Sequence, residues 1–247
     1  MRSLKAKEFG TPDSSDFFQH PVRQRKKRRV IYPESDGKPM ADNTRQFQWI
    51  VKIKENLERM FADNPNVFVA GDLLWYPVEG NNKIRNAPDA MVAFGRPKGH
   101  RGSYRTWDEN NIAPQVVFEI LSPGNRKAEM DKKLEFYEKY KVEEYYVYDP
   151  DRIRLSGYIR SGKALMPVDA DKMKNWVSPR LKIRFDLRED ELHIFDHEGE
   201  EFLTHLESTL QYKAKIQSES QRAEEAENRA AKLAAKLREL GISPDQL

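Results

Sequence analysis

Hydrophobic side chains at helical spacing mark the first regular segment of the chain. Residues 43–61 carry them at Phe47, Ile50, Ile53, Leu57 and Met60/Phe61, which is the spacing of one helix face. Asp42 or Asn43 can cap this helix. The turn residues Asn64-Pro65-Asn66 end it.

Short segments rich in β-branched and aromatic residues follow, and they predict strands. We expect strands at residues 67–75, 89–94, 115–121 and 145–148, a hairpin from 152–160 and 163–168, and shorter strands near 181–185 and 192–195. A second helix is expected from Gly124-Asn125 to about Lys141. Gly71 predicts a bulge or kink in its strand.

The pattern changes again at Glu207, where two sets of residues recur every seven positions. One set is Ile216, Ala223, Ala230 and Leu237, and the other is Ala226, Leu233 and Leu240. This is the a/d pattern of a coiled coil, which predicts self-association into a homodimer. Glu219 interrupts the seam and the alanines weaken it, so a single solvated helix is the alternative. We therefore divide the chain into a loose basic arm (1–40), a folded domain (41–206) and a helical tail (207–247).

Composition restricts the kind of protein. Charged residues make up 34% of the 247 residues, and the net charge is only +3. Cysteine is absent, which excludes disulfides and thiolate metal sites and fits the cytoplasm. We expect no membrane segment, because no apolar run approaches the roughly 20 residues that a membrane helix needs. The N-terminus lacks the apolar centre of a secretory signal.

Basic residues gather in two segments. Residues 23–29 read Arg-Gln-Arg-Lys-Lys-Arg-Arg, and the loop 96–105 holds five basic side chains when His100 is counted. Such clusters can contact DNA phosphates, which gives affinity without sequence information. From the loop we expect contacts by Arg96, Lys98, Arg101 and Arg105. The alternative for residues 23–29 is a solvated tail.

The candidate chemistry lies in two acids and a lysine. Asp89 follows Pro88 at the start of one predicted strand, Glu119 lies inside another, and Lys133 follows on the second helix. A carboxylate among apolar neighbours needs a cation or a shifted pKa. Carboxylates hold Mg²⁺ (or Mn²⁺), which binds substrate phosphate and activates water. We therefore predict Asp89 and Glu119 as metal ligands and Asp89, Glu119 and Lys133 as catalytic.

Each of these residues also has a structural interpretation. Asp89 could be a turn residue, Glu119 could form a simple ion pair, and Lys133 could pair with Glu129 on the helix surface. Asp72 could supply a third metal-binding carboxylate or terminate a bulge. The five histidines show no metal spacing.

Four stretches of the chain resemble the Uma-type family of PD-(D/E)xK endonucleases. They are Ala87-Pro88-Asp89, Val117–Pro123, Lys133 with Tyr137, and Val142–Pro150. The resemblance covers roughly residues 43–195. It implies an α/β fold, in which a restriction-endonuclease-like core has a mixed β-sheet flanked by helices, followed here by a C-terminal coiled-coil helix.

The chain departs from the superfamily pattern in two places. Leu121 stands two residues after Glu119, where the superfamily usually has lysine, and the resemblance implies that Lys133 on the following helix replaces it. Related nucleases often carry Glu in the first helix, where Gln46 or Gln48 stands here.

The first hypothesis is therefore a Mg²⁺-dependent DNA endonuclease. The second is a nuclease-derived binding or scaffold protein without catalysis, which acts through its coiled coil. A third is a glycoside hydrolase, since two carboxylic acids can also cleave glycosides. Lys133 and the basic loop argue against the third.

Overall fold

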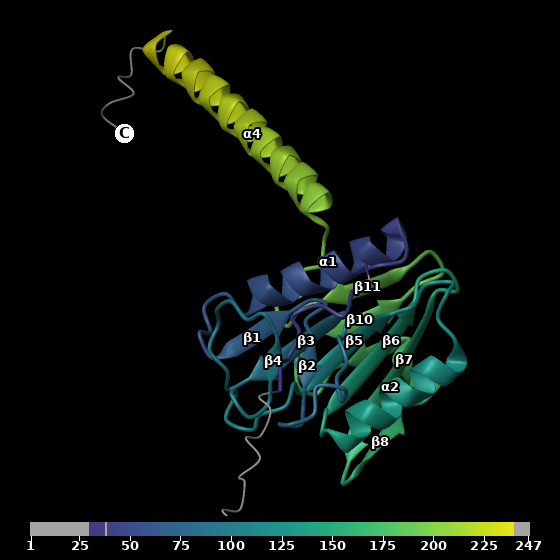
Figure 1. Ribbon diagram of the computed structural model, residues 1–247. Helices are drawn as coiled ribbons and strands as arrows, with labels where there is room; N and C mark the ends of the chain where they lie inside the picture. Colours follow the sequence, from purple (N-terminus) through teal and green to yellow (C-terminus); the bar gives the residue numbers. More distant parts are fainter. Residues whose placement is uncertain (1–29, 38, 240–247) are drawn as a thin grey trace, which may run out of the picture. The chain divides into compact units, whose positions relative to one another are not determined.

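The computed structural model describes residues 30–37 and 39–239 (Figure 1). The basic run at 23–29 and the seam residue Leu240 therefore lie outside the described residues. Within residues 31–33, the carbonyl oxygens of Ile31 and Pro33 accept hydrogen bonds from Asn82 Nδ2 and the Tyr76 hydroxyl, each at 2.7 Å.

A six-stranded mixed sheet forms the centre of the fold. Strand β5 pairs in parallel with β6, and every other neighbouring pair in this sheet is antiparallel. In spatial order the strands are β1 (Val67–Ala70), β3 (Ala90–Phe94), β5 (Val116–Ile120), β6 (Glu144–Asp149), β7 (Arg154–Ser161) and β8 (Ala164–Pro167).

Helix α1 (Thr44–Met60) packs on one face of this sheet. The Asn43 side chain caps it by accepting the Gln46 N–H at 2.9 Å. Its apolar stripe packs with β-strand residues such as Val92 and Phe118. A three-stranded sheet shares this core through Phe185 and Ile194; its strands are β9 (Asn175–Val177), β10 (Arg184–Leu187) and β11 (Leu192–Phe195). The short helix α3 (Ala170–Met173) adds Met173.

Helix α2 (Lys127–Lys139) packs on the opposite face, as Figure 1 shows. Its buried residue is Tyr137, which shares a second core with Val117 and Tyr145. The parallel pair β2 (Trp75–Tyr76) and β4 (Tyr104–Arg105) completes this side. Because successive side chains on a strand alternate between faces, Glu119 lies on the α2 side with Val117. The predicted α/β class, a mixed sheet flanked by helices, is confirmed.

The predicted strand at 67–75 is wrong in one respect, because it is interrupted. Strand β1 ends at Ala70, and the chain turns through Gly71 and Asp72 before β2 begins at Trp75. Asp72 has φ 45°, and its N–H donates to the carbonyls of Pro88 and Asp89 at 3.1 and 3.3 Å. The turn thus brings Asp72 beside the start of β3.

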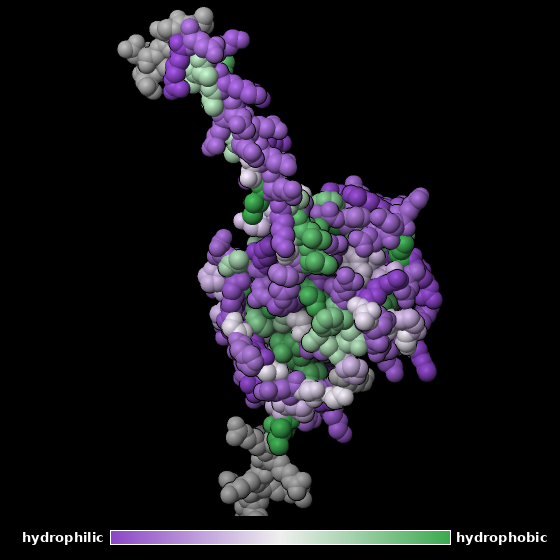
Figure 2. All heavy atoms as spheres, turned by 90° about the horizontal axis from the view of Figure 1, so that it is seen from above, coloured by the Kyte–Doolittle hydropathy of each residue, from purple (hydrophilic) through white to green (hydrophobic). Residues whose placement is uncertain are grey.

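The tail forms helix α4 (His205–Glu239), of which no residue is buried. Its start is fixed by a capping box, in which the Thr204 hydroxyl accepts the Glu207 N–H and Glu207 accepts the Thr204 N–H. Figure 2 shows mostly hydrophilic side chains along it, with isolated hydrophobic ones. Among the described residues, no helix combines the length and apolarity that crossing a membrane requires.

Candidate active site

Strand β5 carries Glu119 into the interior between the sheet and α2, where it is 2% exposed. Lys133 Nζ lies 2.6 Å from Oε2, and the Tyr137 hydroxyl donates to Oε1 at 2.5 Å. Both donors come from α2, one helical turn apart, so they share a face. The expectation that Lys133 reaches Glu119, and not merely a surface partner, agrees with these distances.

Asp89 lies directly before β3 and is 7% exposed. Its Oδ2 accepts the N–H of Ile120, the residue after Glu119, at 2.6 Å. Burial, and then the charge of Glu119, raises the pKa of Asp89 well above its usual range. The negative charge of Glu119 therefore favours the protonated form of Asp89.

Asp72 supplies a third carboxyl group to the same region. Burial, then the charges of Asp36 and Glu119, raises its pKa to about 6. Aspartate is among the residues that tolerate a left-handed backbone, so the turn holds this acid at little cost. Asp72 lines the same pocket as Asp89 and Lys133.

Lys133 stays protonated in this setting. Burial alone would lower its pKa, but Glu119, Asp89 and Glu129 together raise the pKa above its ordinary value. The Lys133 side chain is 19% exposed, so its ammonium can still meet a ligand. A lysine that holds its proton this firmly acts through its charge and not as a base.

Two more residues reach the site, namely Gln46, which the sequence offered as an alternative to Gln48, and Asn86, which the sequence did not assign to it. Gln46 on α1 donates to the Ile120 carbonyl at 2.8 Å, whereas Gln48 is exposed, which decides between the two glutamines. Asn86 donates to the Tyr137 hydroxyl at 2.9 Å and so fixes the ring that holds Glu119. The four-residue step from Lys133 to Tyr137 was the signal that could have identified Tyr137.

Gln46, Asp72, Asn86, Asp89 and Lys133 line a pocket of about 310 Å³, whereas Glu119 and Tyr137 are not among its lining residues. Its charged lining comprises one lysine, Lys133, and the five acids Asp36, Asp42, Asp72, Asp89 and Glu129. We call it the acidic pocket. Asp72 and Asp89 have raised pKa values, and an excess of carboxylates is an environment that a cation stabilises.

A divalent metal is compatible with this pocket, but through few protein ligands. Among the described residues, no group of three His, Cys, Asp or Glu side chains is arranged to hold a metal ion. One carboxylate oxygen of Asp89 already accepts a hydrogen bond from the protein. Both carboxylate oxygens of Glu119 do so. Mg²⁺ usually retains several waters and takes only one or two carboxylates, so Asp89 and Glu119 would be enough in number, provided that Glu119 released Lys133 or Tyr137.

The basic loop differs from the surface that the sequence suggested. Arg96 and Arg101 both bond Glu109, at 2.8 and 2.5 Å, and their side chains are only 11% and 13% exposed. Arg105 pairs with Asp108 at 2.9 Å, and Lys98 is exposed. The two arginines therefore stabilise the loop, which leaves Lys98 and Arg105 for the predicted phosphate contacts.

Comparison with known proteins agrees with the motifs. The family model Uma2, described as a putative restriction endonuclease, matches residues 15–201, and this confirms the resemblance. A crystal structure of a putative nuclease belonging to DUF820 from Anabaena variabilis aligns at 16% identity with a TM-score of 0.42, covering 59% of this chain and 79% of that one. No curated protein matches the chain.

Proposed function

The chain belongs to the Uma2 family of putative restriction endonucleases, and on that premise we propose that it is a Mg²⁺-dependent DNA endonuclease that hydrolyses phosphodiester bonds. The observation that carries the proposal is the 2.6 Å contact between Lys133 and Glu119, beside Asp89. A buried acid pair next to a protonated lysine can accept both a cation and the phosphate that the cation binds.

Asp89 and Glu119 would hold the metal, with Asp72 contributing through water. A bound Mg²⁺ supplies charge neutralisation at the phosphate and a more acidic water. Two N–H or O–H donors preorganise these acids: the Ile120 N–H orients Asp89, and the Tyr137 hydroxyl orients Glu119. Burial and the charge of Glu119 raise the pKa of Tyr137 well above its ordinary value, so Tyr137 remains a donor throughout.

Lys133 would stabilise the negative charge that develops on the phosphoryl group. Its raised pKa favours this electrostatic role over abstraction of a proton from water. Preorganised charge in a water-poor site is commonly worth a factor of roughly 10²–10³ in rate. Substrate entry would shift Lys133 from Glu119 toward phosphate, and its partial exposure permits that movement.

Nicking of supercoiled plasmid in Mg²⁺ or Mn²⁺ tests the proposal, with wild type compared to Asp89→Asn. We expect metal-dependent nicking by wild type and a loss of at least about 100-fold in the variant, because a metal ligand is removed. The matched control is Glu135→Gln, an exposed acid on α2 outside both the acidic pocket and the neighbouring pocket lined by Arg126 and Arg154. Equal nicking by wild type and Asp89→Asn would contradict the assignment.

The exposed helix α4 favours one rival, a non-catalytic scaffold that acts through its tail. The same assay separates the two, since a scaffold gives no metal-dependent nicking in any variant.

A further inference from the structure

A second pocket, of about 370 Å³, lies beside the acidic pocket. It is lined by α2, by alternate residues along β6 and β7, and by Leu121 just after β5, and Asn125 lines both pockets. Asn125 lies two residues before Lys127, the first residue of α2, and Arg126 is the N-cap between them. A ligand that occupies both pockets therefore passes around the amino-terminal end of this helix.

The charge of the second pocket is opposite to that of the first. Its four basic side chains are Arg126, Lys127, Arg152 and Arg154, against only two acids, Asp131 and Asp149. We call it the basic pocket. One pocket thus suits a metal ion, and its neighbour suits an anion.

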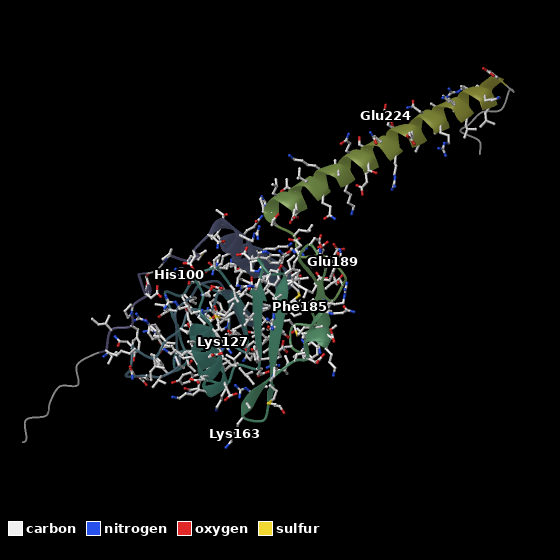
Figure 3. The ribbon with its side chains drawn as sticks, turned by 90° about the vertical axis from the view of Figure 1, so that its right-hand side faces the viewer. His100, Lys127, Lys163, Phe185, Glu189 and Glu224 are labelled. Atoms are coloured by element: carbon white, nitrogen blue, oxygen red, sulfur yellow. The ribbon has the colours of Figure 1, made fainter. Side chains whose placement is uncertain are left out.

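These cations are available to a ligand. Arg126, Lys127 and Arg154 are exposed, and the Arg152 side chain is 80% exposed even though it bonds Asp149 at 2.9 Å. Figure 3 shows Lys127 on α2. Asp149 also accepts the N–H groups of Asp151 and Arg152 at 3.1 and 3.0 Å. Its charge is therefore compensated by its own turn, and little of it remains to repel a phosphate.

The interior of the basic pocket is apolar and begins one strand away from Glu119. In the β5–β6 register Glu119 lies opposite Val147, and Val147 lies opposite Ser156 of β7. Val147 and Ser156 line the pocket together with Leu121, Met130, Leu134 and Tyr158. An apolar wall below a rim of arginines matches a sugar-phosphate unit, whose sugar offers an apolar surface and whose phosphate is anionic.

The loop 96–105 is a poorer candidate than the basic pocket for binding a phosphate of the DNA backbone. Its two least exposed arginines, Arg96 and Arg101, share the carboxylate of Glu109, which cancels one of their two positive charges. The residues His100, Arg101 and Arg105 line a different pocket, which shares no lining residue with the acidic pocket.

We propose that the basic pocket binds the DNA backbone phosphate next to the scissile one, so that the cleaved strand runs from the acidic pocket around the start of α2. This inference rests on the proposed function, because it takes DNA as the substrate. It assigns Arg126 and Arg154 as phosphate-contacting residues and Asn125 as the point where the strand crosses between the pockets.

The test measures the affinity of the full chain for a short fluorescein-labelled DNA duplex. Fluorescence anisotropy reports the binding, in EDTA and over a range of salt concentrations. The variant is Arg126→Gln with Arg154→Gln, and the control is Lys163→Gln with Lys172→Gln, which removes the same charge from exposed positions outside the basic pocket. Figure 3 shows Lys163 at a distance from Lys127. Circular dichroism verifies that each variant is folded.

We expect the arginine variant to bind about tenfold more weakly at moderate salt. A plot of log affinity against log salt concentration has a negative slope, and the magnitude of this slope should decrease by about two. The reason is that each lost phosphate contact removes close to one unit from it. The control should keep the wild-type slope. Equal losses in both variants, or wild-type binding by the arginine variant, would overturn the inference.

The proposed function is judged separately, by nicking in Mg²⁺. Wild-type DNA binding by the arginine variant, together with metal-dependent nicking, would reject the basic pocket and leave the nuclease intact. A wild-type chain that binds no DNA would overturn the basic pocket as a DNA site, whatever its activity.

Discussion

The ionised side chain of Asp72 lowers the folding stability of the protein, although it belongs to the candidate active site. Its pKa is raised to about 6 by burial and by neighbouring acids, against an ordinary value near 3.9. The folded protein therefore binds this proton more tightly than the unfolded chain. Stability is lost as the pH rises from about 4 to about 6, and the cost is fully present above that range.

Replacing Asp72 by Asn should consequently stabilise the protein when no metal is present. We expect the free energy of unfolding at pH 7.5 in EDTA to rise by about 1 kcal/mol, after discounting for the partial exposure of the side chain. Asn also tolerates the φ of 45° at this position. Urea unfolding at several pH values measures the effect.

The same gain should disappear near pH 4, where Asp72 is protonated in both states of the wild type. A gain that does not change with pH would show that the Asp72 charge is not its cause. Destabilisation at pH 7.5 would contradict the raised pKa itself.

At the scale of elements, the sequence predicted most of the central sheet and a bulge or kink at Gly71, but not that the strand ends there. Strands β3, β5 and β11 and helix α1 were recognisable because their apolar spacing is strong and local. The turn at Gly71-Asp72 depends on hydrogen bonds to Pro88 and Asp89, which are distant along the chain. The short elements β4, β9 and α3 contain too few residues for any periodicity to be visible.

In the candidate site, too, residues with a local sequence signal could be predicted, and residues that depend on contacts between elements could not. Asp89, Glu119 and Lys133 could be named from a strand pattern, a helix pattern and a family motif. Tyr137, Asn86 and Gln46 enter through contacts between elements, and the sequence could not choose between Gln46 and Gln48. The pairing of Arg96 and Arg101 with Glu109 was also hidden, because a count of basic residues does not show which acids fold against them.

At the scale of the whole molecule, α4 raises the question of assembly. Its side chains are exposed along the full helix, with Ile216 at 48% and Leu233 at 60%. Large apolar side chains in water at heptad spacing favour a helical partner. The prediction of a homodimer through this seam therefore stands as a hypothesis about a second copy of the chain.

Leu233→Glu should disrupt that dimer, because it places a charge in the seam. The matched control is Ala235→Glu, two positions on and outside both heptad sets, so it adds the same charge away from the seam. Sedimentation velocity at micromolar concentration should give a dimer for wild type and for the control. A monomer is expected for Leu233→Glu. A wild type that is monomeric would contradict the seam.

The central claim is that Asp89 and Glu119 form a divalent metal site, and calorimetric titration with Mn²⁺ tests it most directly. The comparison is wild type against Glu119→Gln, with Glu129→Gln as a control that removes an exposed acid from the acidic pocket. A neutral amide is a poor ligand for a hard cation. We therefore predict saturable binding by wild type and by the control, and no measurable binding by Glu119→Gln while its thermal unfolding remains cooperative. Equal Mn²⁺ affinity in wild type and Glu119→Gln would contradict the metal site.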